Sequence, residues 1–261
     1  MSIISLAMHK SREKTPGRRE RAQRTDPEPI LEPERDLSGK SVTQVQSPDS
    51  HVLEGNRILR AITDQGVQDA YNLLRTQILQ LTKPMGWNTL MITSVGPKEG
   101  KTISAINLGM SMAMDTQQTC LLVDTHLRKP KVHAYLDLET DKGLTDYLLS
   151  DTPVHELLVN PGMDQFVVLP SGRALSSSTD ILKSPKMASL VKELKTRYHD
   201  RYVIFDCPHI LNMPDALVFS SYVDGVILLV DADRTQQQDI ESALDVLQQS
   251  NLIGMVMNKV R

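Results

Sequence analysis

The sequence contains few cysteines, no long apolar run and almost no net charge. Cys120 and Cys207 lie far apart in apolar segments, which argues against a disulfide framework or a cysteine metal site and favours reduced core thiols. No run approaches the roughly 18 apolar residues of a membrane span, and residues 1–8 meet charged residues too soon for a secretory signal. The net charge of −3 argues against a general nucleic-acid binder. We therefore expect a cytoplasmic protein with no nucleic-acid partner.

The first fifty residues are rich in charge and proline and poor in apolar side chains. Residues 10–24 are mainly basic and residues 26–36 mainly acidic, with four prolines among them. Because such a composition cannot offset the entropy cost of ordering the chain, we expect residues 1–52 to form a disordered tail. Residues 2–8 alone carry enough apolar side chains for a short amphipathic helix, with a frayed terminus as the alternative.

From residue 53 onward, two kinds of apolar pattern alternate. Short β-branched runs typical of buried strands occupy residues 89–93, 119–124, 166–169, 201–206, 225–230 and 252–258. Helical spacing occupies residues 103–114, 187–198, 215–223 and 237–249, and a first helix is expected over 64–83, which Asp64 can cap. This alternation predicts one α/β domain over residues 53–261, with a mostly parallel sheet covered by helices on both faces.

A phosphate loop is predicted between the first of these strands and the helix that follows it. The loop ends in Gly100-Lys101-Thr102, in which glycine allows close approach of the backbone, lysine reaches the β- and γ-phosphates, and threonine binds magnesium. The helix amino terminus adds backbone N–H groups and the positive end of its dipole. The full pattern has a glycine five residues before Gly100, where this chain has Val95 followed by Gly96. An ordinary strand-to-helix turn is the alternative.

Three further polar residues stand at the ends of predicted strands. Asp124, Asp206 and Asn258 should converge on the phosphate loop, because ligands of parallel sheets bind beyond the carboxyl ends of the strands. Asp206 is expected to hold Mg²⁺, and Asp124 either to accept a proton from the attacking hydroxyl or to share the metal. The alternative for each aspartate is a capping role in the next loop.

Two segments carry a resemblance to a known family. Residues 123–130 (VDTHLRKP) resemble the second Walker-type motif of the bacterial tyrosine kinases (BY-kinases), the P-loop NTPases of capsule and exopolysaccharide synthesis, and residues 202–208 (YVIFDCP) resemble their Walker B strand. The resemblance covers residues 68–260 and leaves the tail uncovered. The family is similar in fold to partitioning and division-site ATPases, whose signature lysine is absent here. Lys98 stands where a glycine is usual.

The resemblance implies that the chain binds ATP and Mg²⁺. The catalytic residues it implies are Asp124 and Lys101, and the metal-binding residues are Thr102, Asp124 and Asp206. The nucleotide-binding residues are Gly96, Glu99, Gly100, Lys101, Thr102, Ile103, Arg128 and Asn258, the last of which would face adenine. His126 replaces the second aspartate of the Walker-type motif, which removes a negative charge near the metal.

The resemblance also implies partners. A membrane chain-length (polysaccharide co-polymerase) protein would activate the chain at the inner face of the membrane. The family oligomerises through a helix with one Glu and two Arg at three-residue spacing, where this chain has Asp69, Asn72 and Arg75. The family ends in a tyrosine-rich tail that a neighbouring subunit phosphorylates, whereas the last tyrosine here is Tyr222. The resemblance therefore implies ATP binding more directly than autophosphorylation.

Two main functions follow from these observations, with a third behind them. The first is an enzyme, an ATPase or tyrosine-kinase-like phosphotransferase that controls polysaccharide assembly. The second is a nucleotide-gated regulatory module without kinase activity, which His126 favours. A partitioning or positioning ATPase is the third.

Overall fold

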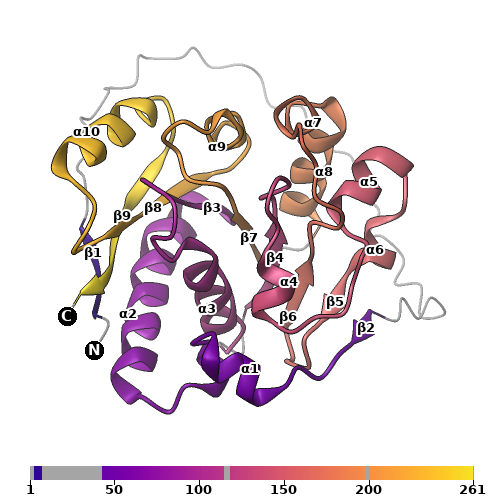
Figure 1. Ribbon diagram of the computed structural model, residues 1–261, viewed down its shortest axis with the longest axis horizontal. Helices are drawn as coiled ribbons and strands as arrows, with labels where there is room; N and C mark the ends of the chain where they lie inside the picture. Colours follow the sequence, from indigo (N-terminus) through magenta and orange to yellow (C-terminus); the bar gives the residue numbers. More distant parts are fainter. Residues whose placement is uncertain (1–2, 8–42, 115–117, 198–199, 261) are drawn as a thin grey trace, which may run out of the picture.

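The computed structural model describes residues 3–7, 43–114, 118–197 and 200–260, and its centre is a nine-stranded sheet with helices on both faces (Figure 1). In spatial order the strands are β1 (Ile3–Ala7), β9 (Leu252–Val260), β8 (Gly225–Asp231), β3 (Thr89–Ser94), β7 (Arg201–Asp206), β4 (Thr119–Asp124), β6 (Phe166–Leu169), β5 (Val159–Asn160) and β2 (Gln44–Val45). Only the β1–β9 and β5–β6 pairs are antiparallel. The expected mostly parallel α/β fold is confirmed.

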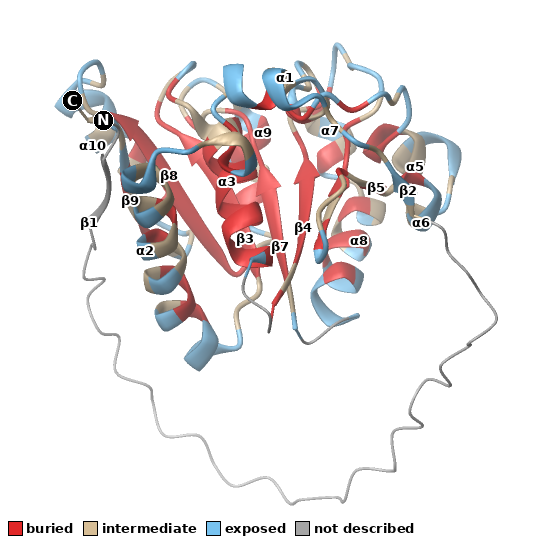
Figure 2. Cartoon of the chain, turned by 90° about the horizontal axis from the view of Figure 1, so that it is seen from below, coloured by how far each residue is buried: buried red, intermediate tan, exposed pale blue. Residues whose placement is uncertain are grey.

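Helices cover the two faces of the sheet because alternate residues of each central strand point to opposite sides. Leu90 and Ile92 of β3 pack with α2 (Gln65–Thr82) and α3 (Lys101–Ala113) on one face. Met91 lies in the core of the other face, which is covered by α5 (Leu144–Ser150), α8 (Pro185–Thr196), α9 (Pro214–Ser220) and α10 (Gln237–Val246). Figure 2 shows the buried strands between these two layers.

The six predicted strands and five predicted helices are all present, with ends within a few residues of those expected. Asp64 caps α2 as expected, since its carboxylate accepts hydrogen bonds from the N–H groups of Gly66 and Val67. The other described elements after residue 43 were not predicted: β2, β5, α5, α1 (Ser50–Gly55), α4 (Val132–Tyr135), α6 (Val154–Leu157), α7 (Thr179–Leu182), η1 (Leu59–Ala61) and η2 (Lys83–Met85). Cys120 and Cys207 are buried free thiols, as expected.

The N-terminal region differs from the expectation at the places where it is described. Residues 3–7 form a strand on the outer edge of β9 instead of a short helix. So short a helix has little stability of its own, whereas the edge of β9 offers backbone hydrogen-bonding partners. β2 and the first residues of α1 lie inside the segment expected to be disordered, and residues 1–2 and 8–42 of that segment lie outside the described residues. None of the described helices is both long and apolar enough to cross a lipid bilayer.

Candidate functional site

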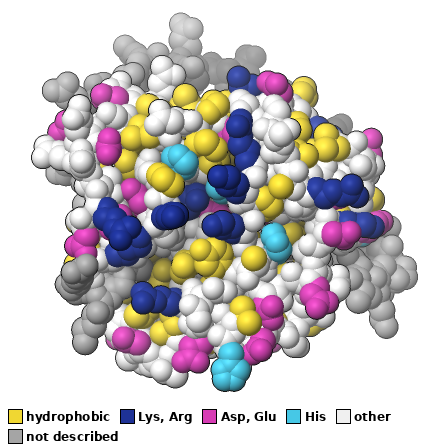
Figure 3. All heavy atoms as spheres, viewed as in Figure 1, with side chains coloured by type: hydrophobic (Ala, Val, Ile, Leu, Met, Phe, Trp, Pro, Cys, Tyr) yellow, Lys and Arg dark blue, Asp and Glu magenta, His cyan; other side chains and the backbone are white. Residues whose placement is uncertain are grey.

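The carboxyl ends of three adjacent strands bring the predicted site residues together. β7 pairs with β3 on one side and with β4 on the other, in a register that places Asp206 opposite Ile92 and Asp124 opposite Asp206. The loop after β3 leads into α3 at the same edge of the sheet. On this face of the molecule, Lys and Arg side chains gather toward the middle together with histidines (Figure 3). The electrostatics of the face therefore suit an anion.

The phosphate loop adopts a backbone that explains its glycine. Gly100 is the N-cap of α3 with a φ of 96°, and a Cβ placed there would lie 2.2 Å from the Asn258 side-chain nitrogen. That nitrogen donates to the carbonyl of Glu99 at 2.9 Å, so β9 supports the loop from behind. Lys98, where the family has glycine, also has a left-handed φ of 64°. Its carbonyl accepts a 2.7 Å hydrogen bond from Lys259 Nζ, which braces the strained residue.

Thr102 and Asp206 form the most direct link between the loop and β7. Thr102 Oγ1 donates to Asp206 Oδ2 at 2.7 Å, and both residues are buried. Asp206 Oδ1 is buried with no hydrogen-bond partner among the residues described. Desolvation raises the pKa of Asp206 to about 7, against the opposing charge of Lys101 and with a smaller contribution from Asp124. A divalent cation would relieve this buried carboxylate.

The donor set at this position fits magnesium. Thr102 and Asp206 offer hard oxygen atoms, which Mg²⁺ prefers, and Mg²⁺ usually completes its shell with water and substrate phosphates. In the described part of the chain, no three His, Cys, Asp or Glu side chains gather closely enough to hold a metal by themselves. The residues present therefore suit a magnesium ion that arrives with a nucleotide.

Asp124 organises the loop that follows β4. Its Oδ1 accepts from the backbone N–H of His126 at 3.0 Å, and its Oδ2 accepts from the N–H groups of Lys131 at 3.0 Å and Val132 at 3.1 Å. This is the loop-capping role that was the alternative for a strand-end aspartate. Burial raises the pKa of Asp124 despite these three donors. A carboxylate accepts about four hydrogen bonds, so one acceptor position remains for a proton or a metal.

Two histidines lie near Lys101. Desolvation, with a smaller contribution from the charge of Lys101, lowers the pKa of His126 to about 4. The pKa of His209, in the loop after β7, is lowered by burial and then by Lys101. Both imidazoles are therefore neutral at pH 7 and can donate or accept hydrogen bonds, but they carry no charge to hold a phosphate.

Arg128 is placed differently from the other predicted nucleotide ligands. Its Nε donates to Asp215 Oδ2 at 3.2 Å and to Ser178 Oγ at 2.9 Å, and its Nη2 donates to Thr179 at 3.3 Å. Ser178 and Thr179 also donate to the Asp215 carboxylate. Desolvation alone would raise the pKa of the Asp215 carboxyl. The hydrogen bonds from Ser178 and Thr179 and the charge of Arg128 outweigh it, so the pKa of Asp215 is lowered. Arg128 thus ties the second Walker-type loop to α7 and α9.

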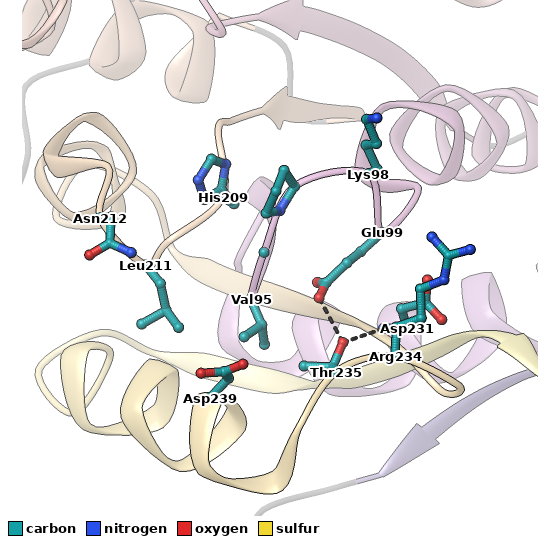
Figure 4. A pocket seen from close by; sticks show the side chains of 12 residues that line it. Val95, Lys98, Glu99, His209, Leu211, Asn212, Asp231, Arg234, Thr235 and Asp239 are labelled. Atoms are coloured by element: carbon teal, nitrogen blue, oxygen red, sulfur yellow. Dashed lines mark hydrogen bonds between the residues drawn. The ribbon is translucent and has the colours of Figure 1, made fainter.

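Two pockets flank the phosphate loop. The first, here called the charged pocket, has a volume of about 310 Å³ and is lined by residues that include Lys98, Glu99, His209, Asp231, Arg234 and Asp239. Figure 4 shows Glu99 pointing toward Thr235, which donates to its Oε1 at 2.7 Å, while Lys98 points the opposite way. The second lies beside residues 56–62, a segment here called the arm, and is called the arm pocket. It has a volume of about 380 Å³ and is lined by residues that include Gly100, Ile103 and Asn258.

The structure therefore brings together most of the predicted site residues and adds others. Thr102 bonds to Asp206, and the charges of Lys101 and Asp124 act on that same carboxyl. Gly96 and Glu99 line the charged pocket, and Ile103 and Asn258 line the arm pocket. His209, Arg234 and Thr235 were not predicted. Of these, His209 carried a usable signal, since it follows the Walker B strand directly.

Comparisons with known proteins agree with this geometry. A family profile described as an AAA domain matches residues 95–252. The chain is 32% identical over 192 residues to the tyrosine-protein kinase YwqD of Bacillus subtilis (strain 168), which covers 73% of this chain and 80% of that protein. The kinase domain of VpsO is 27% identical with a TM-score of 0.67, covering 76% of this chain and 98% of that one.

A second solved structure has the same fold. The kinase domain of the Escherichia coli tyrosine kinase ETK is 24% identical with a TM-score of 0.71, covering 77% of this chain and 79% of that one. The family profile spans more than half of the chain, and the YwqD match covers most of that kinase. The chain therefore belongs to the P-loop family of bacterial tyrosine-protein kinases.

Proposed function

We propose that this chain binds Mg²⁺ and ATP at the loop between β3 and α3 and transfers the γ-phosphoryl group to a tyrosine hydroxyl or to water. The observation that carries the proposal is the buried Thr102–Asp206 pair, in which one carboxylate oxygen remains unpaired beside Lys101. Bound magnesium would neutralise charge on the phosphates. Thr102 and Asp206 would hold it, with Asp124 next to them in the adjacent strand.

The roles of the other residues follow from their positions. Lys101 and the loop amides would bind the β- and γ-phosphates, and Gly96, Glu99 and Gly100 would shape that loop. Asp124 would take the proton of the attacking hydroxyl through its remaining acceptor position. Ile103 and Asn258 would face the nucleoside, and Arg128 would act by holding its loop to Asp215.

We further propose a cytoplasmic location at the inner face of the membrane, reached through a membrane chain-length protein of polysaccharide export that activates turnover. The names and the fold of the relatives support this proposal. Oligomerisation through α2 is part of it, although Arg75 Nη1 here donates to the Ser111 carbonyl of α3 at 2.6 Å. Contact with a second copy would have to replace that bond or use other residues of α2.

A nucleotide-gated module without turnover is the second candidate. Two observations favour it: Asp124 already accepts three backbone N–H bonds, and the neutral His126 occupies the place of a second carboxylate. In this case ATP would change partner affinity and no phosphoryl group would leave.

Measuring turnover distinguishes the two candidates. ATP hydrolysis and tyrosine phosphorylation are followed for the full chain, with and without the cytoplasmic ends of a co-encoded membrane protein. Turnover that rises on addition of those ends supports the enzyme. Tight ATP binding with turnover no faster than a protein-free control, under both conditions, supports the module. Binding to DNA would instead support a partitioning ATPase, and none is expected.

A further inference from the structure

The last strand of the sheet holds the phosphate loop by two neighbouring side chains. Asn258 Nδ2 donates to the Glu99 carbonyl at 2.9 Å. Lys259 Nζ donates to the Lys98 carbonyl at 2.7 Å. None of the described peptide bonds is cis, and a trans peptide directs its C=O and its N–H to opposite sides. The two bonds therefore turn the N–H groups that follow these carbonyls, those of Glu99 and Gly100, away from β9, as an anion-binding loop requires.

A bulge in β9 explains why these neighbouring side chains reach the same loop. Successive residues of a regular strand point to opposite faces of the sheet. Where β9 pairs with β1, the two steps of residues 3–5 match the three steps of residues 257–260, so β9 holds one extra residue. Lys259 lies inside this stretch and has a left-handed φ of 58°, a conformation found in one class of bulge. The irregularity therefore directs Lys259 toward the loop beside Asn258.

The ammonium of Lys259 is fixed by a second acceptor. It also donates to Asp231 Oδ2 at 2.7 Å, and Asp231 is buried at the carboxyl end of β8. The other oxygen of this carboxylate accepts from the Asp233 N–H at 3.2 Å, so the acid itself has a set orientation. Charge-assisted hydrogen bonds of this kind are shorter and stronger than neutral ones. Lys259 thus connects the phosphate loop to the buried end of the neighbouring strand.

The carbonyl that Lys259 holds belongs to a residue in an unfavourable conformation. Lys98 has a left-handed φ of 64°, which costs free energy for a residue with a Cβ and costs glycine nothing. The Lys98 side chain is exposed and points away from Glu99 (Figure 4), so the restraint on this residue acts through its backbone. If that restraint were lost, the loop would relax toward a conformation that lysine prefers, and the N–H of Glu99 would turn with it.

We infer that Lys259 is a positioning residue of the phosphate-binding site, which holds Lys98 in the left-handed conformation that the loop needs. The inference rests on the proposed function, since it concerns the loop that would bind the phosphates of ATP. Lys259 acts on the loop carbonyl and not on the nucleotide. Its importance therefore depends on the side chain at position 98, because a residue without a Cβ would adopt the same backbone unaided.

Calorimetric titration of the full chain with ATP and, separately, with inorganic tripolyphosphate tests this dependence, in the presence of Mg²⁺. Lys259→Met should weaken the binding of both ligands about tenfold, because the cost of the left-handed backbone at Lys98 is then no longer offset. In the Lys98→Gly background, the same substitution should change either affinity by about twofold at most. Methionine keeps an unbranched side chain at the left-handed position 259, so the backbone there is not altered.

A matched control and a stability measurement accompany the titrations. Lys186→Met is the control, because Lys186 of α8 also pairs with an aspartate, Asp151, which follows α5. It should change neither affinity. The Lys259 side chain is 42% exposed, so Lys259→Met should fold, and its thermal midpoint checks this.

Other outcomes overturn the inference. It is wrong if Lys259→Met leaves both affinities unchanged, if it weakens ATP binding alone, or if it weakens both ligands equally in the two backgrounds. The last result would mean that the lysine acts on the phosphates through its charge. Lys101→Ala, which should lose both ligands, reports on the proposed function separately. A wild type that binds neither ligand would reject the proposed function and the inference together.

Discussion

The two pockets beside the phosphate loop differ in the character of their walls. In the charged pocket, Glu99 is buried beside Thr235, and burial raises the pKa of its carboxyl. In the arm pocket, the side chains of Ile62 and Ile103 offer apolar surface instead. Charged walls suit polar groups and apolar walls suit a ring, whereas Lys101, Asp124 and Asp206, which carry the proposed chemistry, line neither pocket. Variants of those residues separate nucleotide binding from turnover.

The largest effect should come from Lys101, the residue proposed to pair with the phosphates. Lys101→Ala is expected to lower ATP affinity by about 100-fold or more, because it removes the ammonium that pairs with the phosphates. The fold should persist, since the Lys101 side chain is only partly buried. Calorimetry measures the affinity, and Lys192→Ala, at an exposed position of α8, is the control. Unchanged ATP affinity in Lys101→Ala would refute the phosphate-loop assignment.

A change at the residue proposed as the base should leave ATP binding intact. Asp124→Asn is expected to bind ATP and to lower turnover about 10²-fold, the usual loss for a positioned base. Because the amide keeps one oxygen, at least one of the three backbone N–H groups loses its acceptor, and the thermal midpoint should drop by a few degrees. Steady-state kinetics with Asp141→Asn as a surface control measures this. Equal turnover in Asp124→Asn and wild type would leave Asp124 only its loop-capping role.

The buried Asp206 should make the metal-free protein sensitive to pH. With a folded pKa of about 7 and an ordinary unfolded value of 3.8, Asp206 binds its proton more tightly when folded. The stability it contributes is therefore present at low pH and is lost as pH rises from about 4 to about 7. Asp206→Asn should gain stability relative to wild type over that range, on the order of 1 kcal/mol per pH unit, and level off above it. Urea unfolding with a chelator present measures the difference.

The wild-type curve alone would not isolate Asp206, because His126 acts in the opposite direction. The folded pKa of His126, about 4, lies below its ordinary value of 6.5. The stability that the neutral imidazole contributes is therefore lost as pH falls from 6.5 to about 4. The difference between the variant and wild type cancels this shared contribution. A difference that does not change with pH would contradict the raised pKa of Asp206.

A smaller effect is expected at His126. His126→Asp should raise Mg²⁺-dependent turnover several-fold, because a second carboxylate restores oxygen ligands that magnesium prefers. ATP affinity without magnesium should not rise, since the new charge repels the phosphates. Kinetics across a magnesium titration measure both quantities. If wild type, His126→Asp and Asp124→Asn all match a protein-free control, the nucleotide-gated module is the better description.

The smallest effect concerns the boundary of the folded unit. We propose that a protease removes the N-terminal tail first, and that the stable core starts before Asp49 and not at residue 53, because α1 and the residues after it contact the rest of the domain. Mass spectrometry of the early fragments measures this. Fragments that begin at Asp64 and keep full ATP affinity would show that the arm is not part of the site.

The sequence alone determined the order of strands and helices and the place of the phosphate loop. Both depend on local patterns, because β-branched runs and a 3.6-residue apolar spacing act within about ten residues. Gly100-Lys101-Thr102 and its two flanks lie in one such stretch, and Asp64 caps α2 through N–H groups two and three residues away. Asp124, Asp206 and Asn258 could be placed because parallel strands share one carboxyl edge.

Only the tertiary structure decided which side chains meet across long distances in the chain. Asp215 binds Arg128 across 87 residues, and Asn107 holds the arm at Leu59 across 48, neither of which leaves a periodic trace in the sequence. The same holds for residues 3–7, whose backbone pairs with an edge strand at the other end of the chain. Such contacts depend on which edges and surfaces the assembled sheet leaves open, and local propensity carries no information about those.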